Sequence, residues 1–211
     1  MKRHLVIFAR APQMGRVKRR LAAGIGTKAA YDFYVATLVH QIRTLARDPR
    51  WTVWLFVTPD TAVRHPAWRG LRVRPQGTGD LGRRMKRPFA ILPPGPTVLV
   101  GSDIPGLRPH HIARAFALLG GHELVFGPAA DGGFWLFGAK RIKPLPPSLF
   151  SNVHWSTSSA LADTLAGIPP ASAALADTLD DVDDVTAYRR FRLSSSARTA
   201  AKTAAQSPGT D

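Results

Sequence analysis

The chain contains short, continuous apolar segments that alternate with segments of helical periodicity. The apolar segments are HLVIFA at 4–9, WTVWLFVT at 51–58, LRVRP at 71–75, TVLVG at 97–101, ELVFG at 123–127 and FWLFG at 134–138. A run that is apolar on both faces suits a strand covered by helices on both sides. Strands that alternate with helices predict an α/β fold, here a single domain with a mostly parallel sheet and helices on both faces.

Helices are predicted between these strands from apolar spacing and from the positions of proline and glycine. Residues 31–45 carry apolar side chains at spacings of three and four, with Thr27 as the expected N-cap. The other predicted helices cover 81–92, 109–119, a segment from Ser156 or Thr157 through Leu165, and 182–191.

Length and composition indicate one globular domain, which we place at residues 1–193. Residues 194–211 contain no apolar side chain larger than alanine, so we expect a disordered tail there. The absence of cysteine excludes disulfides, thiolate metal sites and a cysteine nucleophile. The first apolar run ends at Arg10, which is too short for a signal peptide or a membrane span, and we expect a cytoplasmic protein.

The formal net charge of +15 predicts a preference for anionic ligands. Nucleic acid, acidic lipid and small phosphorylated molecules all meet that description. The basic residues are spread along the chain, and no Lys/Arg tract is interleaved with aromatic residues. We therefore favour small phosphates over nucleic acid.

The first predicted strand leads into a basic turn that carries a glycine, RAPQMGRVKRRLAAGIG at 10–26. Gly15 would let the backbone approach a ligand closely, and a helix starting near Val17 would add free N–H groups. The cationic side chains that could contact phosphate are Arg10, Arg16, Lys18 and Arg20. The turn predicts a phosphate-binding loop, with a solvated basic loop as the alternative.

A second glycine turn, PQGTGDLGRRM at 75–85, has the spacing G-x-G-x-x-G between a strand and a helix. With Asp103 about 20 residues downstream, this is typical of a nicotinamide-binding loop. The unit lies in mid-chain, however, and a nicotinamide enzyme would leave the other turns unexplained. An ordinary loop with glycine turns is the simpler interpretation.

Two acidic residues follow predicted strands. Asp103 comes directly after the buried strand at 97–101, and Asp131 stands in FGPAADGGFWLFG between two strands. Carboxylates at the carboxyl edge of a sheet suit Mg²⁺ or Mn²⁺, which take one or two protein carboxylates together with substrate phosphates. If the strand at 123–126 lies near the one at 97–101, the two acids meet. A turn-capping role for Asp103 and a hairpin at Asp131-Gly132 are the structural alternatives.

Six segments, in order, resemble a bacterial family of GT-A-type glycosyltransferases. They are FARAPQMGRVKRRLA, GDLGRRM, VGSDIPGL, GPAADGGFWLFG, NVHWSTSSAL and LDDVDDVTAY, and the resemblance covers about residues 4–191. The family is similar in fold to molybdenum-cofactor and phospholactate guanylyltransferases.

The resemblance implies a nucleotide-diphospho-sugar transferase fold with its site residues. Gly15, Lys18 and Arg20 match the phosphate loop, although the family has Thr where this chain has Arg19. Asp103 matches the metal ligand, and residues 131–133 match an acid-glycine-glycine turn in which Gly132 and Gly133 approach the substrate. Gly79 and Asp80, in GDLGRRM, join the predicted nucleotide site.

Two further features have both a functional and a structural interpretation. His154 could act as a base or contact the acceptor, but a structural histidine beside Trp155 is the interpretation that we favour. The acidic residues 180, 181, 183 and 184 lack the spacing of a calcium loop, so we interpret them as the start of a helix.

Together these patterns predict a metal-dependent transferase that uses a nucleotide-diphospho-sugar donor and an acceptor, with Asp103, Asp131 and His154 as catalytic candidates. Its cofactor would be Mg²⁺ or Mn²⁺, held by Asp103 and Asp131. The alternative is a nucleotidyltransferase that joins an NTP to a phosphorylated acceptor and releases pyrophosphate. A non-catalytic protein that binds anions or nucleic acid is a third hypothesis, which rests on charge alone.

Overall fold

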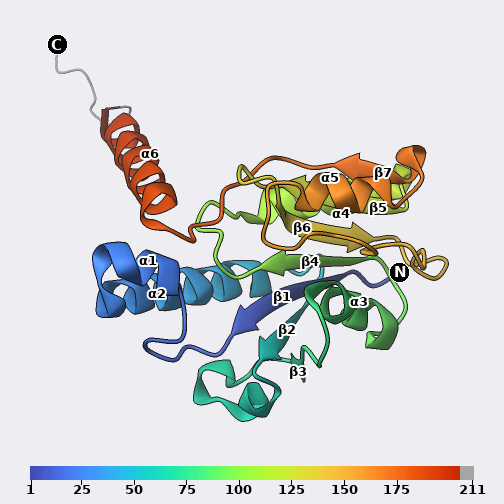
Figure 1. Cartoon of the computed structure of the whole chain (residues 1–211), viewed down its shortest axis with the longest axis horizontal. Helices are drawn as coiled ribbons and strands as arrows, with labels where there is room; N and C mark the ends of the chain where they lie inside the picture. Colours follow the sequence, from blue (N-terminus) through green and yellow to red (C-terminus); the bar gives the residue numbers. More distant parts are fainter. Residues whose placement is uncertain (205–211) are drawn as a thin grey trace.

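The computed structural model describes residues 1–204, with side chains through residue 194 (Figure 1). Its core is a seven-stranded sheet in the order β3-β2-β1-β4-β6-β5-β7. The strands are β1 (His4–Arg10), β2 (Thr52–Thr58), β3 (Val73–Pro75), β4 (Thr97–Gly101), β5 (Leu124–Pro128), β6 (Phe134–Ala139) and β7 (Ala173–Leu175). All neighbouring strands are parallel except β6, which is antiparallel to both β4 and β5. The predicted α/β fold is confirmed.

Six α-helices connect and cover the strands. They are α1 (Arg19–Ile25), α2 (Thr27–Ala46), α3 (Leu81–Ile91), α4 (Pro109–Gly121), α5 (Ala160–Ala166) and α6 (Val185–Ala204), with short 3₁₀ turns η1 (Asp60–Arg64), η2 (Pro66–Trp68) and η3 (Pro170–Ser172). Thr27 is the first residue of α2 rather than its N-cap, which is Gly26 with φ 87°. Among residues 1–204, no helix combines the length and the apolar character that crossing a membrane requires.

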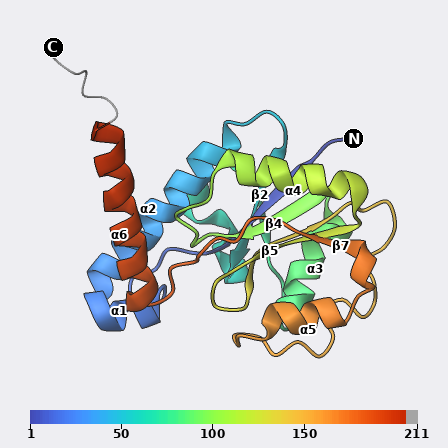
Figure 2. The same cartoon turned by 90° about the horizontal axis from the view of Figure 1, so that it is seen from above.

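Each face of the sheet buries its own set of apolar side chains. On one face, Ile7 and Val57 pack with residues of α2 and α4, and on the other, Phe56 and Phe137 pack with residues of α3 and α5. Figure 2 shows α2 and α4 on one side of the sheet and α3 and α5 on the other. Because both faces are covered, the central strands can be apolar on both sides, as their sequences are.

The antiparallel strand β6 determines how near β5 lies to β4. The strand that ends near Phe126 does not neighbour β4, because β6 pairs with both β4 and β5. The segment between β5 and β6 is therefore a hairpin, as the structural alternative for Asp131-Gly132 predicts. Since β5 runs in the same direction as β4, this hairpin turn still lies at the edge of the sheet where β4 ends.

The last helix, α6, packs against α1 and α2 through a small aromatic cluster. The Phe33 ring meets the rings of Tyr188 and Phe191 edge to face, with centroids 5.2 and 5.9 Å away. Leu21 and Val182 are buried beneath them. The helix continues to Ala204, well beyond the predicted end at residue 191, and its far end projects from the body (Figure 1). Residues 194–204 of the expected tail belong to this helix, and residues 205–211 lie outside the described part, so the disorder of the tail stays a prediction.

We expect Phe33→Ala to loosen α6 without unfolding the sheet. The substitution removes the ring that both aromatic residues of α6 contact, a loss on the order of 1–2 kcal/mol. Limited trypsin digestion should then cut within residues 189–192 faster than in the wild type, while the remaining domain stays intact. Leu193→Ala is the control, because Leu193 lies on α6 with 73% of its surface exposed. Equal cleavage of both variants would contradict this docking role for Phe33.

Candidate functional site

A cleft of about 510 Å³ lies where the parallel strands β1, β2 and β4 end. Its walls come from the turn after β1, the residues after β4, the N-terminal part of α3 and strand β6. Parallel sheets of this kind bind ligands beyond the carboxyl ends of their strands, where the connecting loops gather. This cleft is therefore the candidate site.

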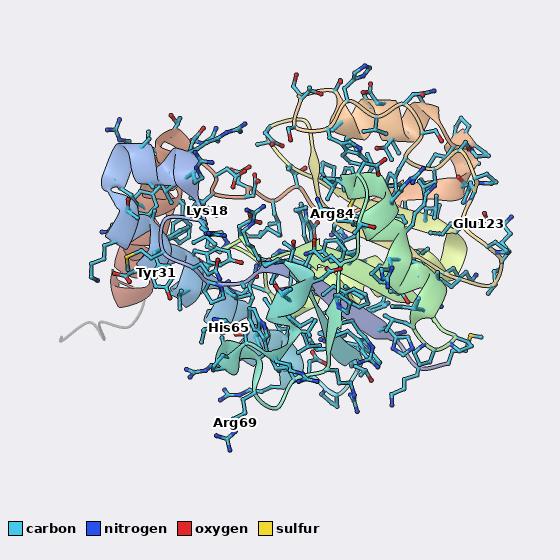
Figure 3. All side chains as sticks on the ribbon, turned by 60° about the horizontal axis from the view of Figure 1, so that its bottom comes forward. Lys18, Tyr31, His65, Arg69, Arg84 and Glu123 are labelled. Atoms are coloured by element: carbon cyan, nitrogen blue, oxygen red, sulfur yellow. The ribbon has the colours of Figure 1, made fainter. Side chains whose placement is uncertain are left out.

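Lys18 lines the cleft, and its side chain contacts residues from distant parts of the chain (Figure 3). Its Nζ donates to Asp103 Oδ2 at 2.9 Å and to Asp183 Oδ1 at 2.5 Å. The side chain is only 4% exposed. Burial by itself lowers the pKa of Lys18, but the two carboxylates outweigh burial and hold the pKa above its usual value.

Three carboxylates gather around this ammonium group. Asp103, Asp181 and Asp183 each offer an oxygen atom, and these atoms lie within 4.8 Å of one another. The backbone fixes the arrangement, because the Val182 N–H donates to the Asp103 carbonyl at 3.1 Å. The pKa of Asp181 is raised to about 7, mainly by burial and in addition by the negative charges of the neighbouring carboxylates.

The chemistry of this donor set fits a hard divalent cation. Carboxylate oxygens are the protein ligands that Mg²⁺ and Mn²⁺ prefer. One ammonium group faces three carboxylates here, and burial, together with repulsion among the carboxylates, raises the pKa of Asp181. A dication bound among them would relieve that repulsion. Among the described residues, no other three His, Asp or Glu side chains bring their ligand atoms within 4.8 Å of one another.

The basic turn after β1 lies beside these carboxylates, as predicted. Arg10, Arg16, Lys18 and Arg20 all line the cleft. Gly15 has φ 77°, a conformation that favours glycine, and a Cβ atom there would meet nothing within 4 Å. The helix expected near Val17 begins at Arg19 and has only seven residues, so the positive charge comes from side chains. Tyr34 fixes the strand end, because its hydroxyl accepts from the Arg10 N–H and donates to the Arg10 carbonyl.

The second glycine turn caps α3 and does not itself line the cleft at Gly79 or Asp80. The Asp80 carboxylate accepts from the Arg83 N–H at 2.7 Å and caps α3, and neither Gly79 nor Asp80 lines the cleft. A carboxylate on this helix N-terminus would repel a pyrophosphate group, which argues against the nicotinamide interpretation. The turn still positions α3, whose Leu81 and Arg84 form part of the cleft wall.

Asp131 shapes the hairpin turn between β5 and β6. Its Oδ1 accepts from the Gly133 N–H at 2.9 Å. Gly132 has φ 86°, and a Cβ there would lie 2.0 Å from the Ser158 carbonyl, so only glycine fits. Asp131 is not one of the three clustered acids, although its charge helps to raise the pKa of Asp181. A metal-binding role for Asp131 stays a prediction.

His154 lies away from the cleft lining. Its side chain is 78% exposed, and its Nδ1 lies 2.9 Å from the Asp163 carboxylate. That carboxylate also accepts from the His154 backbone N–H, and these contacts hold the pKa of Asp163 below its usual value. The pairing agrees with the structural interpretation of His154, and its catalytic role stays a prediction.

The sequence analysis missed three side chains that the fold brings into the cleft region. Asp181 and Asp183 were interpreted as the start of a helix, whereas Asp184 has that function and accepts from the Ala187 N–H at 2.8 Å. The sequence signal for this role is the apolar Val182 between the two acids. An extended segment would bury Val182 and turn its two neighbours to the other side, since alternate residues of a strand point to the same side. The third is Arg84, whose Nη1 donates to Gln76 at 3.1 Å.

Residues 41–157 match the model of a protein family described as "Uncharacterized protein conserved in bacteria (DUF2064)". The chain belongs to this family. The matched segment of the DUF2064 member contains Asp103 and Asp131, whereas Lys18, Asp181 and Asp183 lie outside it. No curated protein sequence matches the chain significantly.

Solved structures share the fold of this DUF2064 member. A protein from Desulfovibrio desulfuricans G20, provisionally described as a nucleotide-diphospho-sugar transferase, has a TM-score of 0.80 and 26% identity, over 88% of this chain and 84% of that one. CMP:2-keto-3-deoxy-manno-octonic acid synthetase in complex with CTP has a TM-score of 0.56 and 10% identity, over 94% and 100%.

A third solved structure is glucosyl-3-phosphoglycerate synthase from Mycobacterium tuberculosis, in complex with Mn²⁺, UDP and phosphoglyceric acid. It has a TM-score of 0.50 and 15% identity, over 85% of this chain and 69% of that one. The chain thus has the fold that sugar transferases and nucleotidyltransferases share, which confirms the predicted resemblance.

The raised pKa of Asp181 predicts how the stability of the metal-free protein depends on pH. Between the ordinary pKa of 3.8 and about 7, folded Asp181 keeps the proton that the unfolded chain has released. Proton binding to folded Asp181 therefore adds to the free energy of unfolding at low pH, and this contribution is lost as the pH rises through that window. Because Asp181→Asn removes the charge, we expect it to be more stable than the wild type at about pH 8, by roughly 2 kcal/mol, and to have no advantage near about pH 4.

Urea unfolding in the presence of a chelator measures this difference at the two pH values. Asp184→Asn is the matched control, because Asn caps a helix about as well as Asp and residue 184 is outside the acidic group. A stability gain for Asp181→Asn that is the same at both pH values would contradict the raised pKa of Asp181.

Proposed function

We propose that this protein is a metal-dependent transferase that uses a nucleotide-diphospho-sugar donor, and thus a glycosyltransferase. The proposal rests on one observation: a cluster of three carboxylates, of which Asp103 and Asp183 line the cleft, lies beside the basic turn at the carboxyl edge of the sheet. A diphosphate needs cationic groups around it, and a divalent cation needs hard oxygen ligands. The cleft offers both side by side.

In this proposal, the clustered carboxylates Asp103, Asp181 and Asp183 hold Mg²⁺ or Mn²⁺. When bound, the cation would neutralise charge that develops on the leaving diphosphate. Arg16 and Arg20, which line the cleft in exposed positions, would bind the phosphates, with Arg10 at the strand end. The half-buried Arg84 on α3 would contribute a further guanidinium from the α3 side.

When the cation binds, the surroundings of Lys18 should change more than those of any other residue in the cleft. Its ammonium group contacts Asp103 and Asp183, two of the three proposed cation ligands. Lys18 and the cation therefore compete for these carboxylates. In the proposed complex, Lys18 is released from this pairing and contributes its charge to the phosphates.

The runner-up is nucleotidyl transfer from an NTP, with release of pyrophosphate. The same carboxylates and basic turn would serve it, because both reactions stabilise a transition state that is rich in phosphate charge. The shared fold also supports it, since one solved structure with this fold is a synthetase in complex with CTP. The Desulfovibrio protein, described by its sugar-nucleotide chemistry and most similar among these three, favours glycosyl transfer.

Metal binding without any nucleotide tests the carboxylate group. We expect Asp103→Asn and Asp183→Asn each to weaken Mn²⁺ binding by about tenfold or more, because each removes a charged ligand. Lys18→Met should strengthen Mn²⁺ binding, because a competing cation is removed. Electron paramagnetic resonance of free Mn²⁺ measures these affinities. Asp184→Asn, which leaves the group intact, is the control, and unchanged Mn²⁺ binding by Asp103→Asn would refute the metal site.

The donor is identified by thermal shift with UDP- and GDP-sugars, NDPs and NTPs, each with and without Mn²⁺. We expect one sugar nucleotide to raise the Tm only when the metal is present, since ligands that bind the folded state alone stabilise it. Metal-dependent preference for an NTP, with pyrophosphate release, would establish nucleotidyl transfer instead. Metal-independent, steeply salt-dependent binding of any duplex would support the nucleic-acid hypothesis.

A further inference from the structure

A second cavity, of about 650 Å³, lies at the β3 edge of the sheet. Its walls are the two 3₁₀ turns η1 and η2, the loop at 69–72, the start of β3 and Trp54 of β2. None of its lining residues belongs to the cleft described above. Its volume lies within the range of small-molecule sites.

The lining of this edge cavity is strongly basic. Arg64, Arg69, Arg72 and Arg74 line it together with His65, and no carboxylate is present. Asp60 is the single acid between residues 49 and 79, and its carboxylate accepts from the Gly77 N–H at 3.0 Å. Within residues 1–194, no carboxylate lies at salt-bridge distance from these four arginines.

Two of these arginines are held over one aromatic ring. The guanidinium carbons of Arg72 and Arg74 lie 5.7 and 5.6 Å from the centroid of the Trp54 ring. The ring is itself fixed, because its Nε1–H donates to the buried His4 at 3.2 Å. Two exposed guanidinium groups therefore lie against the same ring, and no carboxylate pairs with either of them. Cation–π contacts leave their N–H donors free to bind an anion.

The opposite wall of the edge cavity is also fixed. Trp68 is buried, and its Nε1–H donates to the Ala62 carbonyl at 2.9 Å. The His65 ring packs against Trp68, and its Nδ1 accepts from the Ala67 N–H, which leaves Nε2 as the donor nitrogen. Arg69, in contrast, extends away from the body of the molecule (Figure 3). The cationic groups that face the cavity are thus Arg72 and Arg74, which contact Trp54, together with Arg64 and His65 of the other wall.

We propose that the edge cavity is a second anion site, which binds the diphosphate group of a small molecule without a metal. Guanidinium groups keep their charge at any physiological pH and match phosphate oxygens in a two-pronged geometry. Three of them around one concave space can contact two linked phosphates at once. A duplex would instead need a surface that follows its backbone, and this site is a hollow with aromatic walls.

Tryptophan side-chain NMR signals distinguish the two sites within one sample. Trp54 lines the edge cavity and Trp135 lines the cleft, so their indole N–H signals report separately. The probes are inorganic pyrophosphate, UDP and orthophosphate, added to the full-length protein with a chelator. We expect pyrophosphate and UDP to shift the Trp54 signal with similar affinity, and orthophosphate to bind about tenfold more weakly.

The double variant Arg72→Gln/Arg74→Gln should lose the Trp54 response, and it should keep the response of Trp135 to a nucleotide in a parallel sample that contains Mg²⁺ in place of the chelator. The charge-matched control is Arg43→Gln/Arg47→Gln, which changes two exposed arginines of α2 and its C-cap. Arg64→Gln, which leaves the contacts with Trp54 intact, should weaken pyrophosphate binding even if the double variant fails to fold.

Three results would overturn the edge-cavity proposal. One is a Trp54 signal that pyrophosphate does not move, which would leave these arginines as charges that protect an edge strand from pairing. Another is equal loss of binding in the control variant, which would indicate nonspecific attraction. The last is a Trp54 shift that only duplex DNA produces. Failure of the cleft assignment would show separately, as a Trp135 signal that no nucleotide moves when Mg²⁺ replaces the chelator.

Discussion

The ion pairs of Lys18 with Asp103 and Asp183 are the interaction on which the arrangement of the cleft depends. They join the turn after β1, the end of β4 and the segment before α6, which are up to 165 residues apart in the chain. Lys18 is nearly inaccessible to water, so each partner matters more than in an exposed pair. Removing one carboxylate leaves a buried ammonium half-compensated, and removing Lys18 leaves three carboxylates that repel one another. The contacts that organise the cleft are therefore the ones that a cation bound to these carboxylates would have to replace.

The sheet supplies the frame for this interaction. Strands β1 and β4 are neighbours and end at the same edge, which places the basic turn next to Asp103. The antiparallel β6 then brings the hairpin turn with Asp131 to that edge, and α6 fixes the acidic segment from the other side by packing on α1 and α2. Loosening α6 would thus alter the position of Asp183, even though no residue of α6 itself needs to touch a ligand.

Two groups of basic residues lie in settings that differ chemically. In the cleft, cationic side chains stand beside carboxylates, a combination that suits a phosphate ligand together with a metal ion. In the edge cavity, arginines stand on aromatic walls with no carboxylate, a combination that suits an anion alone. The net charge of the chain does not distinguish these two settings, because the difference between them is the position of the acidic residues.

The sequence by itself determined the fold class, because buried parallel strands need continuous apolar runs and the connecting helices need their own periodicity. It also determined the basic turn and Asp103, since both directly follow recognisable strands. Only the tertiary structure decided that β6 separates β4 from β5, because strand order depends on pairing between segments that local sequence does not specify. The tertiary structure likewise decided that Asp181 and Asp183 join Asp103. Their local pattern fits a helix start equally well, and what selects the other role is the burial of Val182 and a charge 165 residues away on Lys18.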